Sequence, residues 1–125
     1  MYADTDNGGY GGNDRPTHYI LKGRTPEPVP FLIWAIWFAT TDRRIARTKH
    51  RGLTISTVFI GVDSAWTGLP LLFETMVFRG SESMACIRAS TYSEALRRHK
   101  VCERSAHIAM SGRARAKHRE NHDHA

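Results

Sequence analysis

Cysteine is scarce in this 125-residue chain, which contains Cys86 and Cys102 and no other. Two cysteines sixteen positions apart, without a Cys-x-x-Cys spacing, do not make the disulfide framework of a small secreted domain. Long apolar runs are also scarce, since the longest, at residues 31–39 (FLIWAIWFA), is about half of a membrane span. It lies too far from Met1, behind an acidic arm, for a signal peptide. We therefore expect a soluble intracellular protein with reduced cysteines and no membrane contact.

Catalytic motifs are missing as well. The sequence has no Gly-x-Ser-x-Gly, Walker A or His-Glu-x-x-His motif, and the glycines between residues 8 and 12 have no following helix that would make a phosphate loop. Cys86, Cys102, His99 and His107 match no usual zinc-ligand spacing. We therefore expect a protein that is not an enzyme and that holds neither a metal nor a cofactor.

The chain does contain an apolar centre between two polar ends. Residues 1–17 are rich in Gly, Asn and Asp, and residues 112–125 include no large apolar side chain. Neither end can contribute to a hydrophobic core. The sequence thus predicts a flexible arm at 1–17, a single domain at 18–111 and a basic flexible tail at 112–125.

Positive charge is concentrated in the predicted domain. The whole chain has a formal net charge of +6, and residues 18–111 hold thirteen Lys or Arg against seven Asp or Glu. Arginine dominates these cations, and its planar guanidinium suits paired contacts with phosphate or carboxylate. The alternative is a solvated basic surface that keeps the protein soluble.

Hydrophobic periodicity and turn residues divide the domain into strands and helices. Alternation in the string LTISTVFI places Ile55, Thr57 and Phe59 on one face of a strand. Thr91 and Glu94 form a capping box at the start of the last helix, and Gly112 is its predicted end. The predicted elements are a strand at 18–22, a proline-rich extended connector at 25–30, a helix from 31 to about 44, strands at 45–51, 53–60, 71–78 and 84–89, and a helix at 91–112.

The order of these elements favours an α+β fold. Short turns between successive strands predict a small antiparallel sheet of three to five strands, with two helices packed on one face and disordered tails. In the first helix, Phe31, Trp34, Ala35 and Phe38 share one face, while Ile33 and its neighbours Ile36 and Trp37 lie off it. This helix has more apolar surface than one small sheet needs, so a homo-oligomer is expected.

Two groups of basic residues are candidates for ligand binding. The first group follows the first helix and consists of Arg43, Arg44, Arg47, Lys49, His50 and Arg51. The second lies along the last helix and consists of Arg97, Arg98, Lys100 and Arg104. Either group can contact phosphates, and an aromatic ring such as Trp66 can stack on a base.

Glu74 and Asp63 are the acidic residues expected beside folded strands. A carboxylate on an otherwise apolar strand needs a partner, so Glu74 predicts either an Arg–Glu pair or, less favoured, an acid–base group. The predicted ligand contacts are Arg43, Arg44, Arg47, Lys49, Trp66 and Glu74.

The strings STVFIGVD and LLFETMVF are the most specific parts of a pattern that extends from about residue 18 to residue 99 and includes HYILKGRTPEPVP and STYSEALRRH. This pattern resembles a group of small accessory proteins encoded by tailed phages and prophages. The resemblance implies a protein of the host bacterial cytoplasm. The group has no assigned activity, so no residue role is carried over. Its members have a more polar first helix and often His at the position of Ser64.

Together these features predict a non-enzymatic phage protein that counters host defence. It would hold a phosphate-bearing ligand, such as a nucleotide signal, or block a host defence protein. One alternative is a nucleic-acid-binding accessory or regulatory protein, and another is a minor virion component.

Overall fold

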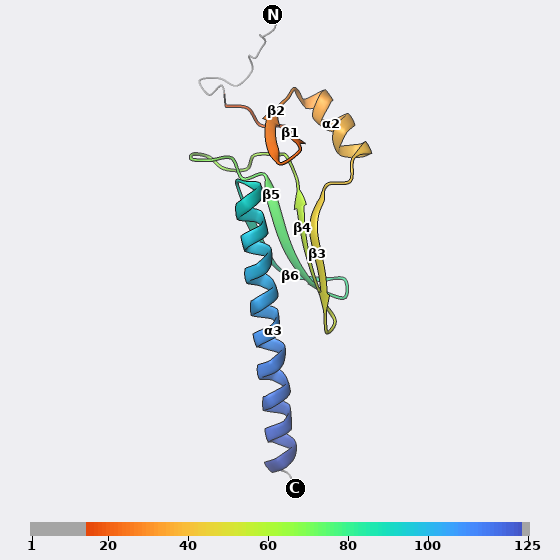
Figure 1. Cartoon of the computed structure of the whole chain (residues 1–125), viewed down its shortest axis with the longest axis vertical. Helices are drawn as coiled ribbons and strands as arrows, with labels where there is room; N and C mark the ends of the chain where they lie inside the picture. Colours follow the sequence, from red (N-terminus) through yellow and green to blue (C-terminus); the bar gives the residue numbers. More distant parts are fainter. Residues whose placement is uncertain (1–14, 124–125) are drawn as a thin grey trace, which may run out of the picture.

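The computed structural model describes the backbone of residues 15–123 and the side chains of residues 15–109. The described elements are β1 (Tyr19–Lys22), β2 (Thr25–Pro28), α2 (Phe31–Thr40), β3 (Arg44–His50), β4 (Leu53–Phe59), β5 (Phe73–Arg79), β6 (Glu82–Ala89) and α3 (Tyr92–Asp123). Strands β3 to β6 form a four-stranded antiparallel sheet in sequence order, and β1 and β2 form a two-stranded antiparallel sheet. In Figure 1, α3 lies along the large sheet, while the small sheet and α2 sit together at one end of it. The predicted α+β class is confirmed.

Strand β4 supplies the centre of the core. Its burial alternates strictly, with Ile55, Thr57 and Phe59 fully buried, as the sequence predicts. In the register with β5, Thr57 faces Thr75 and Phe59 faces Phe73, so the two strands present one continuous buried face. Burying rings such as these contributes about 2 kcal/mol or more each.

Helix α3 covers that face with small side chains. Ala95, His99, Cys102 and Ala106 are buried at helical spacing, which lets the helix approach the sheet closely. The predicted capping box is present: Thr91 Oγ1 accepts a hydrogen bond from Glu94 N–H at 3.1 Å, and the Glu94 carboxylate accepts one from Ser90 N–H.

The C-terminal end of α3 differs from the predicted end of the last helix. The helix does not stop at Gly112 but continues to Asp123, so the backbone of the predicted flexible tail is helical as far as the structure describes it. A single glycine costs about 1 kcal/mol in a helix interior, and the surrounding Ala, Arg, Lys and Glu residues favour helix. Figure 1 shows this half of α3 projecting beyond the sheet.

The proline-rich segment is a strand rather than a bare connector. In β2, Pro26 faces Leu21 and Pro28 faces Tyr19. Proline has no N–H to donate, so the bonds to β1 must come from the alternate residues, and the prolines leave the outer edge of β2 short of donors. This explains how two prolines fit in a four-residue edge strand.

The domain begins earlier than the sequence predicts. Residues 1–14 of the predicted arm lie outside the described residues, but Arg15 and Thr17 contact the loop after β4. Asp63 N–H donates to Thr17 O at 2.9 Å, and Tyr19 N–H donates to Gly61 O at 2.7 Å. The start of the domain is therefore held against the end of β4.

Helix α2 is apolar but has no buried residue. Trp34 and Phe38 turn toward the domain as predicted, but Trp37 also does so, with its ring 5.5 Å from that of Phe59, whereas Phe31 is 60 % exposed. No helix in the part of the chain that the structure describes is long and apolar enough to cross a membrane.

Gly61 allows the backbone after β4 to lie directly against the backbone of β1 at Tyr19. Its φ is +69°, and a Cβ atom built there would lie 2.2 Å from the carbonyl oxygen of Tyr19. The backbone oxygen cannot move away without breaking the contact between β1 and the end of β4. Glycine is therefore required both by conformation and by space.

We predict that Gly61→Ala lowers the free energy of unfolding by at least about 3 kcal/mol, because strain and a backbone clash add. The matched control is Gly68→Ala, which has a φ of +78° but open space around the position. That change should cost about 1–2 kcal/mol, the conformational part alone. Urea denaturation of both variants measures the difference, and equal losses would show that the clash at Gly61 is relieved.

A candidate binding surface on the open face of the sheet

The two faces of the large sheet differ. Helix α3 covers one face, and α2 packs against the small sheet, so no described helix covers the other, which we call the open face. Strand alternation and register assign its side chains in three cross-strand rows. These are Lys49, Thr54 and Phe78; Arg47, Ser56, Met76 and Cys86; and Arg44, Val58, Glu74 and Arg88.

The basic residues of the open face gather on β3. Arg44, Arg47 and Lys49 are all exposed and follow one another along this edge strand. Alternate residues of a strand stand roughly 6.6 Å apart, so the cations form a line rather than a cluster. An alternative role for these charges is to prevent the edge strand from pairing with a strand of another molecule.

A depression at the β3–β4 turn adds a second feature. It has a volume of about 470 Å³ and is lined by Arg47, Lys49, His50, Arg51, Gly52, Leu53, Thr54 and Gly80. Within the described residues, no carboxylate lies within ion-pair distance of Arg47, Lys49 or Arg51. Three cations thus surround one hollow without a neutralising partner there.

Arg51 is held in an unfavourable backbone conformation. Its φ is +50°, and it is the one described residue other than glycine with a positive φ. Two-residue hairpin turns of this kind normally carry Asn or Asp before Gly, and another L-residue costs about 1–2 kcal/mol. This strained residue is one of those that line the depression.

The remaining predicted contacts lie elsewhere. Arg43 turns away from the open face, with its guanidinium 3.5 Å from the centre of the Phe38 ring and a hydrogen bond to Phe59 O. Arg44 is on the open face but is paired with Asp42 at 3.3 Å. Of the predicted basic residues, Arg47 and Lys49 therefore line the depression without an ion-pair partner among the described residues.

Trp66 and Glu74 lie at the opposite end of the sheet from the depression. Trp66 is 93 % exposed in the loop between β4 and β5, and Glu74 pairs with Arg88 at 3.1 Å. Arg88 also donates a hydrogen bond to Ser64 Oγ at 2.8 Å, so the predicted Arg–Glu pair anchors the loop. One strand length, roughly 20 Å, separates this group from the turn.

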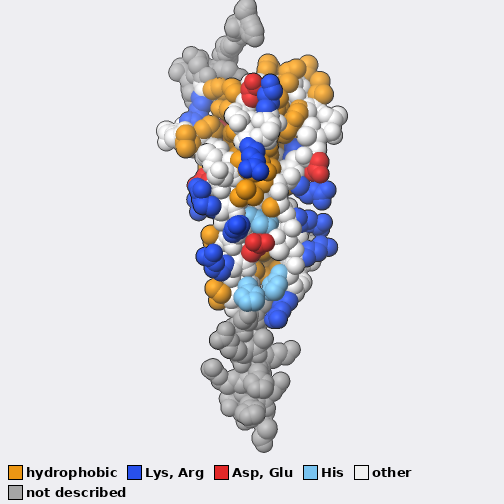
Figure 2. All heavy atoms as spheres, viewed as in Figure 1, with side chains coloured by type: hydrophobic (Ala, Val, Ile, Leu, Met, Phe, Trp, Pro, Cys, Tyr) orange, Lys and Arg blue, Asp and Glu red, His pale blue; other side chains and the backbone are white. Residues whose placement is uncertain are grey.

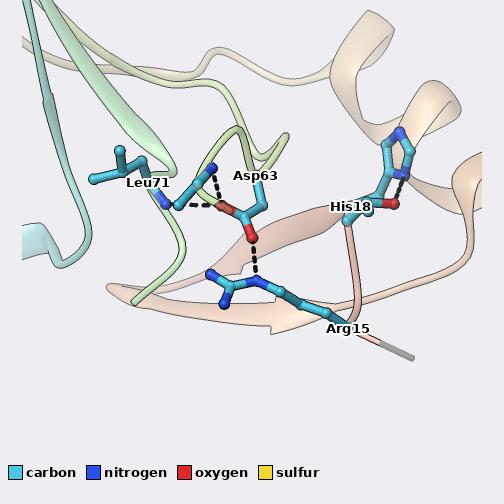
Figure 3. Close-up of polar contacts among 6 residues, drawn as sticks. Arg15, His18, Asp63 and Leu71 are labelled. Carbon is cyan, nitrogen blue, oxygen red and sulfur yellow. Dashed lines mark hydrogen bonds and ion pairs between the residues drawn. The ribbon is translucent and has the colours of Figure 1, made fainter. Parts of the chain in front are cut away.

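The loop itself is organised by Asp63 (Figure 3). One carboxylate oxygen accepts hydrogen bonds from Ala65 N–H and Leu71 N–H, and the other accepts one from Arg15 Nε at 2.6 Å. Burial alone would raise the pKa of Asp63, but these hydrogen bonds and the charge of Arg15 outweigh it and hold the pKa below its ordinary value. Asp63 is thus a structural carboxylate.

Sequence reasoning missed the neutral members of the surface. Thr54 and Ser56 place hydroxyl groups beside Lys49 and Arg47, and Gly80 of the β5–β6 turn borders the depression. Alternation along β4 assigns both hydroxyls to the face opposite Ile55 and Thr57, but it does not show that they lie beside the basic residues of β3. The approach of the β5–β6 turn depends on strand pairing that sequence alone does not show.

A buried polar network lies beneath α3 on the covered face. His99 Nδ1 is 2.8 Å from Thr57 Oγ1, and His99 Nε2 is 2.9 Å from Thr48 Oγ1. Thr48 donates to the Glu103 carboxylate at 2.5 Å, so Thr48 Oγ1 must accept from Nε2–H, and Nδ1 accepts from Thr57. This neutral tautomer satisfies every hydrogen-bonding atom of the imidazole.

His99 is a buried histidine in which both ring nitrogens have hydrogen-bond partners within the protein. Burial lowers the pKa of His99, and the charge of Glu103 opposes the shift in part. Over the residues that the structure describes, no three His, Cys, Asp or Glu side chains are grouped so as to hold a metal ion. The network therefore joins α3 to β3 and β4, and nothing in its geometry indicates a ligand.

We predict that stability falls as pH is lowered from about 7.5 to 5.5. The unfolded chain takes up a proton at His99 near pH 6.5, whereas the folded chain does so at lower pH, so protonation favours unfolding within that window. His99→Gln should lower stability but flatten this pH dependence, measured by urea denaturation. His18, whose pKa burial also lowers, serves as the comparison through His18→Gln. An unchanged slope in His99→Gln would contradict the assignment.

Comparisons with known proteins place this chain in no family. Family models, curated proteins and solved structures yielded no match. A function for this chain therefore has to be inferred from the placement of its own side chains.

Proposed function

We propose that the chain is a non-enzymatic accessory protein of a tailed phage or prophage that binds a phosphate-bearing ligand at the β3–β4 turn. The observation that carries this proposal is the strained Arg51 beside Arg47 and Lys49, around a hollow without a neutralising carboxylate in the described part of the chain. The volume of about 470 Å³ falls within the range of small-ligand sites. A nucleotide-sized anion has both the size and the charge to occupy it.

Charge-assisted hydrogen bonds would supply most of the affinity. Arg47, Lys49 and Arg51 present donors and no acceptors, as phosphate oxygens require, and Thr54 adds a hydroxyl on the same face. The lining residues of the hollow include three cations and no carboxylate. This composition suits binding, and it supports the view that the protein sequesters its ligand rather than transforms it.

An anti-defence role would combine this binding mode with the phage setting that the resemblance implies. In that setting the protein would act inside an infected bacterium and meet nucleotide signals of host defence. A small protein that sequesters such a signal needs only affinity and abundance. Blocking a host defence protein through the same basic surface is the other form of this proposal.

Nucleic-acid binding is a second candidate, and the linear arrangement on β3 favours it. Arg44, Arg47, Lys49 and Arg51 follow the strand and its turn in one line, which suits the backbone of an extended strand better than a compact ligand. Phe78 stands in the same cross-strand row as Lys49 and offers a ring for base stacking.

Arg51→Asn tests whether strain at the turn is retained for binding. Asn adopts a positive φ more readily, so the variant should gain about 0.5–1 kcal/mol in the free energy of unfolding. Its affinity for a fluorescent ATP analogue, measured by anisotropy, should fall by about fivefold to tenfold because one charge-assisted contact is lost. A gain in stability with unchanged affinity would show that Arg51 does not contact the ligand.

A double substitution distinguishes binding at the depression from binding that depends only on the positive charge of the whole protein. Arg47→Gln with Lys49→Gln should weaken binding of the same probe by at least about tenfold. Arg97→Gln with Lys100→Gln removes the same charge from exposed positions on α3 and should change affinity less than about twofold.

Salt dependence distinguishes the two candidates in the same assay. Single-stranded DNA that contacts four cations should show a log K against log salt slope of about −3, whereas a mononucleotide should show a shallower slope. Equal losses in both double variants would contradict a specific site.

A further inference from the structure

Two histidines, His50 and His107, meet where the end of β3 lies against α3. Their ring centroids are 5.4 Å apart, and the ring planes are tilted by 47°. His50 follows Thr48 by two residues on β3, which places both on the face that α3 covers. His107 follows His99 by two steps of four residues, so the two lie on the same side of the helix. Figure 2 shows histidine side chains side by side on the surface of the domain.

One nitrogen of this pair lacks a partner. The Nε2 atom of His50 is buried and has no hydrogen-bond partner among the described residues. Such an atom is costly, and native structures normally pair it with protein, water or an ion. His99 shows the contrast, since both of its nitrogens are paired within the protein. Packing against His107 therefore explains where the His50 ring lies but not why its nitrogen is unpaired.

The separation of the two rings suits a shared metal ion. Zn²⁺ binds imidazole nitrogens at about 2.0–2.1 Å, and two ligands of a tetrahedral site subtend about 109° at the ion. Two imidazoles that share such an ion then have ring centroids roughly 5 Å apart. The observed separation of 5.4 Å agrees with this value. One strand and one helix thus present two imidazoles at the spacing of neighbouring ligands of one ion.

The kind of donor selects the kind of ion. Neutral imidazole suits Zn²⁺, Cu²⁺ and Ni²⁺, whereas Mg²⁺ and Ca²⁺ prefer oxygen ligands. No three His, Cys, Asp or Glu side chains are grouped for a metal in the part of the chain that the structure describes, so water would fill the other positions. His107 is exposed, which gives an ion access from solvent. Sequence spacing did not indicate this pair, because only the docking of α3 on β3 brings the two histidines together.

We propose that His50 and His107 bind a divalent transition-metal ion, such as Zn²⁺, between the end of β3 and α3. The ion would provide the missing partner of the buried His50 nitrogen. It would also join the strand to the helix beyond the contacts that His99 makes with Thr48 and Thr57. Because the two ligands come from distant parts of the sequence, the folded chain binds the ion more tightly than the unfolded chain, and the ion stabilises the fold.

Thermal unfolding of the full chain with and without Zn²⁺ tests this site, after isothermal titration calorimetry has given the dissociation constant. Zn²⁺ at about ten times that constant should raise the unfolding midpoint by roughly 5 °C, and EDTA should reverse the increase. Mg²⁺ should cause no increase. His107→Gln should abolish the effect of Zn²⁺ and still fold, because His107 is exposed. His50→Gln should abolish it too, and the double variant should lose nothing more, as expected for two ligands of one ion.

His118→Gln is the matched control, because the sequence contains further histidines near its end that can bind zinc. This variant should keep the increase in full. The proposal is overturned if Zn²⁺ does not stabilise the wild-type protein, if either His50→Gln or His107→Gln keeps the increase, or if His118→Gln loses it. Since the assay contains no phosphate-bearing ligand, its outcome is independent of the anion site proposed above.

Discussion

The docking of α3 on one face of the four-stranded sheet is the contact on which the other features depend. Small side chains bring the helix close, and the His99 network joins it to the strands through Thr48 and Thr57. Because the helix covers this face, the alternate residues of each strand lie on a face that no helix covers in the described part of the chain. The basic residues of β3 are thus presented to solvent by the packing of the opposite side.

The two ends of the sheet have different roles. At one end, Asp63 and the Arg88–Glu74 pair hold a long loop and the N-terminal hairpin in place. At the other end, the tight β3–β4 turn displays Arg51 in a conformation that glycine or asparagine would adopt at lower cost. Strain retained at the turn beside the depression is consistent with a ligand site at that end of the sheet.

Charge and apolar surface are also separated in space. The uncharged helix α2 lies beside the small sheet, whereas the depression lies at the far end of β3 and β4.

Local pattern determined the strands, the capped start of α3 and the face shared by Ile55, Thr57 and Phe59, because side-chain alternation and capping depend on residues close in sequence. Closeness in sequence also grouped Arg47 and Lys49 with the other basic residues that follow the first helix. Only the tertiary structure decided that their face is open and that Trp66 and Glu74 lie a strand length away. Alternation shows which residues share a face, whereas the docking of a distant helix decides which face is covered.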